Sequence, residues 1–307
     1  LNGYAARRAI TYLQSLPEVN GDKIGMLGWS MGGRTTMMSS TDPRITVLAP
    51  AVGGTGFLFE DFWGMPGTAR NSTGWKDIEL FKATVADQSY WPHVSAPLLF
   101  LEAANDFNAP FDLLTKSLSL HETGLDDVSP NNRLVSDPHY NHRVTDASLA
   151  ARVHWMRHHL KEDIEFPETS NSELEISTES GIPLFKLYPD TSSSFEIESI
   201  SIYYGSERVS RTRFWRDATA LDKGTHWEAE LPIFDANEMM AAYAVITYDV
   251  GFTQSVPFGS PTNLLNVASK VHTYYPTGVD DTYSLPVDLD TDIHQIHSLS
   301  PSDLVAN

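Results

Sequence analysis

A five-residue motif, Gly28 to Gly32, constrains the fold more than any other part of the sequence. It has the form G-x-S-x-G, with Ser30 at its centre and a further glycine at position 33. A short apolar run over residues 23–29 precedes the serine, and a helix start predicted at 34–40 follows it. Glycines flank such a turn because the backbone of the strand and that of the helix approach closely there. The motif therefore predicts a sharp strand–turn–helix with Ser30 exposed at its tip, whereas the simpler alternative is a tight turn with an inert serine.

The pattern around this motif indicates a parallel sheet. Amphipathic helices are predicted at residues 4–16 and 146–160, because apolar residues recur there near the helical period. Apolar strands are predicted at 23–29, 45–52 and 98–104, with a shorter one at 133–136. Strands that alternate with helices form βαβ units. The first half of the chain is therefore predicted to be an α/β domain, residues 1–162.

The pattern changes after this domain. Residues 163–180 are acidic and rich in Ser and Thr, and we interpret them as a linker. Strand-like runs follow at 185–188, 195–204, 227–231 and 241–248, and they alternate apolar and polar residues. They predict a small antiparallel β-sandwich domain over residues 181–275. Residues 276–307 are expected to be an acidic tail or the start of a truncated further segment.

Composition excludes several classes of function. The 21 Lys+Arg against 40 Asp+Glu give a formal charge of −19, which argues against nucleic acid and membrane as partners. The chain has no cysteine, so thiol catalysis, disulfide scaffolds and Cys-zinc sites are excluded. No metal-ligand motif is present, and we expect neither a metal nor a cofactor. The compartment stays open, although the composition is compatible with an exported bacterial protein.

The motif becomes chemically meaningful if a base and an acid reach Ser30. A serine hydroxyl needs a base, and the base needs an orienting carboxylate. On the fold that this motif indicates, the chain order is Ser, then acid, then His. Asp106 directly follows the strand at 98–104, at the edge where open α/β sheets place their site residues. Its alternative role is a helix N-cap. His142 is the predicted base, with His139 as the alternate.

Other residues are predicted to complete the site. Asp87 and Asp112 are weaker candidates for the acid, because Asp87 precedes the strand and Asp112 lies in a helix-like segment. The Met31 amide is predicted to stabilise an oxyanion, because it follows the serine at a helix N-terminus. Residues 53–92 form a long aromatic excursion, either a binding lid or a helical cap with its own core. The predicted substrate contacts are Trp29, Phe57, Trp63, Trp91 and Tyr140.

With Ser30, Asp106 and His142 in this order, the chain resembles the α/β-hydrolase superfamily. The segment LPEVNGDKIGMLGWSMGG is similar to the dienelactone hydrolase and acetyl xylan esterase-like branch. The segments APLLFLEAANDFNAPFD and DPHYNHR look like bacterial members with a C-terminal β domain. The resemblance implies hydrolysis of a carboxylic ester through an acyl-enzyme. In that reaction Ser30 would attack, His142 would act as base and then acid, and Asp106 would orient His142.

The chain departs from that family before the motif. On the order of 100 residues of strands and helices are expected there, since each βαβ unit takes roughly 30 residues. We therefore expect a fragment of a longer protein, with an N-terminal segment or a partner chain covering the open sheet edge. The expected substrate is a small-molecule or carbohydrate ester, such as an acetylated polysaccharide. The alternatives are a serine peptidase of the prolyl-oligopeptidase type and a catalytically silent binding protein.

Overall fold

The computed structural model describes residues 2–61, 69–94, 96–122, 132–168, 170–207, 209–235 and 238–276. Trp63, a predicted substrate contact, lies outside these residues, as does all but the first residue of the predicted tail. Within the described ranges no helix has the length and apolar character needed to cross a membrane.

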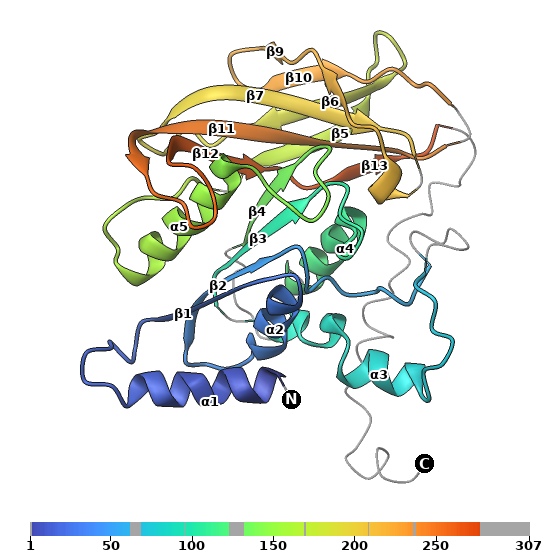
Figure 1. Cartoon of the computed structure of the whole chain (residues 1–307). Helices are drawn as coiled ribbons and strands as arrows, with labels where there is room; N and C mark the ends of the chain where they lie inside the picture. Colours follow the sequence, from blue (N-terminus) through green and yellow to red (C-terminus); the bar gives the residue numbers. More distant parts are fainter. Residues whose placement is uncertain are drawn as a thin grey trace.

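Four neighbouring parallel strands form the first half of a large sheet, as predicted (Figure 1). They are β1 (Ile24–Trp29), β2 (Ile45–Ala51), β3 (Leu98–Ala103) and β4 (Asn132–Asp137), paired in this order. β2 and β3 are almost entirely buried, which is expected of parallel strands covered on both faces. Among the described strands β1 pairs with β2 alone, and Leu27 on it is 52% exposed. The segment expected to cover this edge stays a prediction.

Five helices accompany these strands in the described residues. They are α1 (Asn2–Gln14), α2 (Met31–Ser39), α3 (Ile78–Thr84), α4 (Phe111–Glu122) and α5 (Asp146–Leu160). Side-chain caps fix two of the starts: Asp77 accepts from the Leu80 amide and Thr145 from the Ser148 amide. Short 3₁₀ turns occupy 87–89, 91–93 and 210–212.

The helices cover both faces of the parallel strands. Successive side chains of β3 alternate between two cores, with Leu99 and Leu101 in one and Leu98 and Phe100 in the other. The first core includes Trp155 from α5, and the second includes apolar residues of α1, α2 and α4. Neighbouring side chains of a strand point to opposite faces of the sheet. Therefore α5 lies on one face, and α1, α2 and α4 lie on the opposite face.

The sheet continues from β4 into antiparallel strands. These strands are β12 (Thr262–Ala268), β11 (Met240–Gln254), β7 (Glu196–Gly205) and β8 (Arg216–Ala218), with β13 (His272–Tyr274) also paired to β11. β12 pairs with β4 at Ala268 and Leu134, so hydrogen bonding crosses from the first half of the chain to the second. The sheet therefore runs through both of the predicted domains, whose boundaries stay a prediction.

A second, four-stranded antiparallel sheet packs on the antiparallel half (Figure 1). Its strands lie in the order β5 (Asn171–Ile176), β6 (Pro183–Tyr188), β10 (Trp227–Glu230) and β9 (Leu221–Asp222). Phe185 and Leu187 of β6 share a core with Ile202 of β7 and Tyr248 of β11. This packing gives the sheet-on-sheet arrangement that the alternating strands predicted.

Several strands lie outside the predicted ones, among them the short strands β8, β9 and β13. Residues 171–176, predicted as linker, form β5, because Leu174 packs against the shared core and the backbone pairs with β6. Residues 262–268, for which no strand is predicted, form β12. The long excursion between β2 and β3 contains α3 and two 3₁₀ turns in its described residues.

Candidate active site

Ser30 lies in a sharp turn between β1 and α2. Its backbone has φ +56° and ψ −113°, a strained conformation for a residue with a Cβ atom. The Ser30 amide donates to the Ala51 carbonyl at 2.9 Å, and its own carbonyl accepts from the Arg34 amide at 3.1 Å. These two bonds hold the turn in place from the neighbouring strand and from the helix.

Close backbone contacts require glycine at position 28 of the motif and at position 53 after β2, whereas a Cβ atom on Gly32 would meet nothing within 4 Å. A Cβ atom on Gly28 would lie 2.1 Å from the Gly32 carbonyl oxygen, and one on Gly53 would lie 2.2 Å from the Ser30 carbonyl oxygen. Real Cβ atoms do not approach backbone that closely. The strand–turn–helix predicted from the sequence is therefore present. Gly53, which follows β2, leaves room for the Ser30 backbone.

Asp106 and His142 are brought together across 36 residues of sequence. His142 Nδ1 lies 2.7 Å from Asp106 Oδ2, and Asp106 is fully buried. Asp106 Oδ1 accepts from the backbone amides of Asn108 and Ala109, the latter at 2.7 Å. One carboxylate oxygen thus accepts from the turn that follows Asp106, ahead of α4, and the other faces the His142 imidazole, whereas the catalytic role of Asp106 stays a prediction.

A chain of contacts links this pair to Ser30. The Asn108 side chain donates to the Val52 carbonyl at 3.3 Å, and Gly53 beside it touches the Ser30 backbone. The residues follow the carboxyl ends of β1, β2, β3 and β4, which lie at one edge of the sheet. Within the described residues no hydrogen bond joins the Ser30 hydroxyl to His142. Such bonds are often long in ligand-free sites and tighten only with substrate.

Met31 is the first residue of α2. The first amides of a helix have no acceptor within the helix and lie at the positive end of its dipole. The Met31 amide therefore lies where an oxyanion donor is expected, and its role as a donor stays a prediction; the Met31 side chain is exposed.

The predicted substrate contacts divide into exposed and buried residues. Trp91 is 0% exposed, stacks on Phe100 and donates to the Gly54 carbonyl at 3.0 Å, and Phe57 is 7% exposed. Both are core residues, which contradicts their predicted contact with substrate. Trp29 is half-buried and packs against the core on the α5 side, with the Arg152 guanidinium 5.9 Å from its ring. Tyr140 is exposed on the loop that carries His142.

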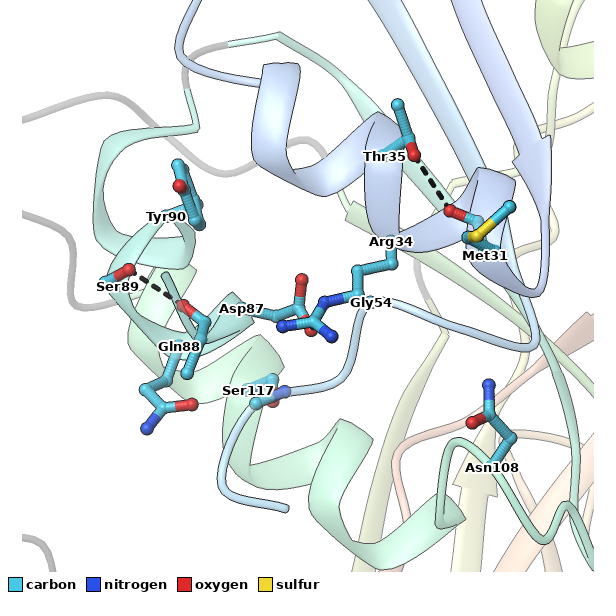
Figure 2. A network of polar contacts seen from close by, with 12 residues as sticks. Met31, Arg34, Thr35, Gly54, Asp87, Gln88, Ser89, Tyr90, Asn108 and Ser117 are labelled. Atoms are coloured by element: carbon cyan, nitrogen blue, oxygen red, sulfur yellow. Dashed lines mark hydrogen bonds and ion pairs between the residues drawn. The ribbon is translucent and has the colours of Figure 1, made fainter. Parts of the chain in front are cut away.

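The weaker candidates for acid and base have other partners. Asp87 is buried and faces Arg34 of α2, with Oδ2 3.2 Å from Nε (Figure 2). Burial raises the pKa of Asp87 to about 7 despite this arginine. Asp112 forms a buried two-pronged ion pair with Arg213. His139 is exposed to solvent.

Two further polar residues surround the acid, and the sequence analysis did not single them out. Arg70 donates to the backbone carbonyl and side-chain oxygen of Asn108, and burial lowers its pKa. Glu102 is fully buried on β3, and burial together with the charge of Asp106 raises its pKa well above the ordinary value. Burial at this position therefore favours the neutral form of Glu102. The sequence offered a clue only to the turn at Asp106, because an Asp side chain commonly accepts from the backbone amide two residues on, as Asp106 does from Asn108.

No group of three or more His, Cys, Asp or Glu residues in the described part of the chain is arranged to hold a metal ion.

Comparison with known proteins gives one family match and distant structural similarity. A family model described as "BAAT / Acyl-CoA thioester hydrolase C terminal" matches residues 7–65, which include Ser30. No curated protein matches the sequence. The family description supports a hydrolase at the level of the family.

Three solved structures illustrate the structural similarity. A puromycin-hydrolyzing peptidase of Mycobacterium tuberculosis is 18% identical, with a TM-score of 0.40, over 52% of this chain and 25% of that one. The acetyl xylan esterase from Paenibacillus sp. R4 is 15% identical, with a TM-score of 0.40, over 52% of each chain. Est1E from Butyrivibrio proteoclasticus is 16% identical, with a TM-score of 0.33, over 46% of this chain and 60% of that one. This chain thus spans between a quarter and three fifths of the length of these proteins.

The parallel sheet and the strained turn at Ser30 have the form expected from the resemblance to α/β-hydrolases, and the family match over residues 7–65 supports that assignment.

Proposed function

We propose that the chain is a serine-dependent hydrolase of carboxylic esters, with Ser30, His142 and Asp106 as its catalytic triad. The observation that carries the proposal is the 2.7 Å contact between His142 Nδ1 and Asp106 Oδ2, at the sheet edge that also holds the strained Ser30 turn. A carboxylate on Nδ1 fixes the imidazole tautomer that leaves Nε2 free to accept a proton.

The proposed reaction has two halves. Ser30 Oγ attacks the ester carbonyl carbon while its proton moves to His142 Nε2, and the oxyanion forms near the Met31 amide. The intermediate collapses to an acyl-enzyme, and the leaving alcohol takes the proton from His142. Water then attacks the acyl group and gives a proton to His142, after which the acid leaves and Ser30 recovers its proton.

The finer proposal is that the ester is small or is an acetyl group on a polysaccharide. Trp75 is 45% exposed, and its ring lies 4.3 Å from that of Phe81. Phe81 in turn packs below the guanidinium of Arg34 on α2, at 5.5 Å. An exposed aromatic ring connected to the helix that follows Ser30 is suited to stacking on a sugar.

Labelling with a fluorophosphonate tests the nucleophile, because only an activated serine reacts. We expect the wild-type chain to be labelled and to hydrolyse p-nitrophenyl acetate, and Ser30→Ala to lose both, with kcat at least about 10³-fold lower. Ser39→Ala is the matched control, since Ser39 is on the same helix and donates to the Thr35 carbonyl. Labelling that survives in Ser30→Ala would refute the proposal.

The substrate class is tested on the same variants. Acyl thioesters are a second candidate, because the matching family model is described by that activity. Acetylated xylan, an acyl-CoA and a peptide anilide are compared by kcat/KM. An ester hydrolase favours the xylan or the short p-nitrophenyl ester, and preference for the anilide would indicate the peptidase alternative.

A further inference from the structure

A buried ion pair connects the C-terminal strands to a helix of the parallel half. The Arg213 guanidinium donates to both carboxylate oxygens of Asp112 on α4, at 2.8 and 3.0 Å, and both side chains are almost fully buried. Arg213 also donates from Nε to the Glu207 carbonyl at 2.8 Å. Its stem passes over Gly205 of β7, where a Cβ atom would lie 2.6 Å from Arg213 Cγ. The arginine is therefore fixed from several sides.

The segment held by this arginine binds Asn105, the residue before the proposed acid. The Asn105 side-chain nitrogen donates to the carbonyls of Ser210 and Arg213, at 2.8 and 2.7 Å. Both of its hydrogens are thus used by a segment that lies more than 100 residues later in the sequence. Because Asn105 is buried, these bonds have no competition from solvent.

Asn105 is also bonded to the loop that carries the proposed base. Its backbone amide donates to the Tyr140 carbonyl at 3.1 Å. One residue beyond Asp106, the Phe107 amide donates to the Asn141 side chain at 3.2 Å. The loop that carries Asp106 and the loop that carries His142 are therefore bonded to each other at Asn105, and the C-terminal segment binds the side chain of that same residue.

We propose that Arg213, clamped by Asp112, positions the Asp106–His142 pair through Asn105. This inference rests on the proposed function, because it assigns these residues a part in catalysis without contact with substrate. It gives the segment that carries Arg213 a part in the reaction, although this segment contributes no residue to the proposed triad. A shift of about 1 Å in a catalytic group costs about 10²-fold in rate, so such positioning is measurable.

Asn105→Ala tests the connection without leaving an unpaired buried charge. We expect kcat on p-nitrophenyl acetate to fall at least about tenfold while KM changes little, since substrate contacts remain. We also expect the low-field NMR signal of the His142 Nδ1 proton to weaken and the pH–rate profile to shift, because its hydrogen bond with Asp106 loosens.

A second variant tests the ion pair itself. Removing one partner alone would leave a buried charge and endanger folding, whereas Asp112→Asn combined with Arg213→Gln removes both charges. The double variant is expected to reproduce the kcat loss and the NMR change of Asn105→Ala. Arg213→Lys keeps one contact with Asp112 and should fall between the double variant and the wild type.

The control is Arg133→Gln. Arg133 is also buried and ion-paired, to Glu168 at 2.6 Å, but lies near the amino end of β4, away from the proposed triad. This variant should lose stability and keep the kcat and the His142 signal of the wild type.

The positioning proposal is overturned if Asn105→Ala and the double variant, when folded, keep the wild-type kcat and His142 signal. It is also overturned if Arg133→Gln changes kcat and the signal as much as they do. The NMR comparison does not depend on activity. A wild type that neither reacts with fluorophosphonate nor cleaves esters therefore refutes the proposed function, while the NMR signal still decides the positioning role.

Discussion

Replacing Asp106 by Asn is predicted to abolish most of the activity by trapping His142 in the wrong tautomer. Two backbone amides, those of Asn108 and Ala109, donate to Asp106 Oδ1. An asparagine at this position must keep its oxygen toward these amides, because its NH₂ group cannot accept from them. The NH₂ group then faces His142 Nδ1, which has to become the acceptor.

An imidazole that accepts at Nδ1 carries its proton on Nε2 and cannot take the proton of Ser30. The expected loss is about 10⁴-fold in kcat, equal to about 5 kcal/mol of transition-state stabilisation. KM should change little, because Asp106 is fully buried and has no contact with substrate.

The assay is the pH–rate profile of p-nitrophenyl acetate hydrolysis together with the rate of fluorophosphonate labelling. Both rates should fall in Asp106→Asn. Asp87→Asn is the matched control, since Asp87 is also buried and lies beside α2 but is paired with Arg34. Its kcat should stay within about tenfold of the wild type. The reasoning fails if Asp106→Asn keeps a kcat within tenfold of the wild type, or if Asp87→Asn loses as much as Asp106→Asn.

Four further predictions follow from the same contacts. Gly28→Ala places a Cβ atom 2.1 Å from the Gly32 carbonyl oxygen, so we expect about 10²-fold lower kcat and a lower melting temperature. His139→Ala should keep nearly the wild-type kcat, because His139 is the exposed alternate base; a loss as large as that of a His142 variant would reassign the base. Trp91→Ala should lower the free energy of unfolding by about 3–5 kcal/mol in urea titrations and leave KM unchanged, because this side chain is wholly buried. Burial lowers the pKa of His154 to about 4. Between about pH 6.5 and pH 4, His154 therefore binds a proton in the unfolded chain and stays neutral in the folded chain. Stability should therefore fall by up to about 3 kcal/mol between pH 6.5 and 4, and less in His154→Phe; an unchanged pH dependence would contradict this.

The sequence by itself determined the local part of the site. The G-x-S-x-G motif and the apolar run before it predicted the turn at Ser30, because a strand that turns sharply into a helix leaves no room for a Cβ atom at Gly28. The alternation of apolar runs and amphipathic segments predicted β1 to β4 and α5, since hydrophobic periodicity reports which face of each element is buried. The order of Asp106 and His142 after these strands predicted their meeting at one sheet edge.

Tertiary structure alone decided which aromatic residues are core and which are accessible. Trp91 and Phe57 are aromatic residues of the kind expected in a binding loop, but both are buried. Large apolar side chains serve either role, and the choice depends on what packs against them from distant parts of the chain. The same is true of Asn105, whose partners at residues 210 and 213 are set by how β7 and β8 lie against α4. The local sequence pattern indicates the hydrophobic period of a segment. It does not indicate which strands pair, because pairing such as that of β12 with β4 depends on contacts between distant parts of the chain.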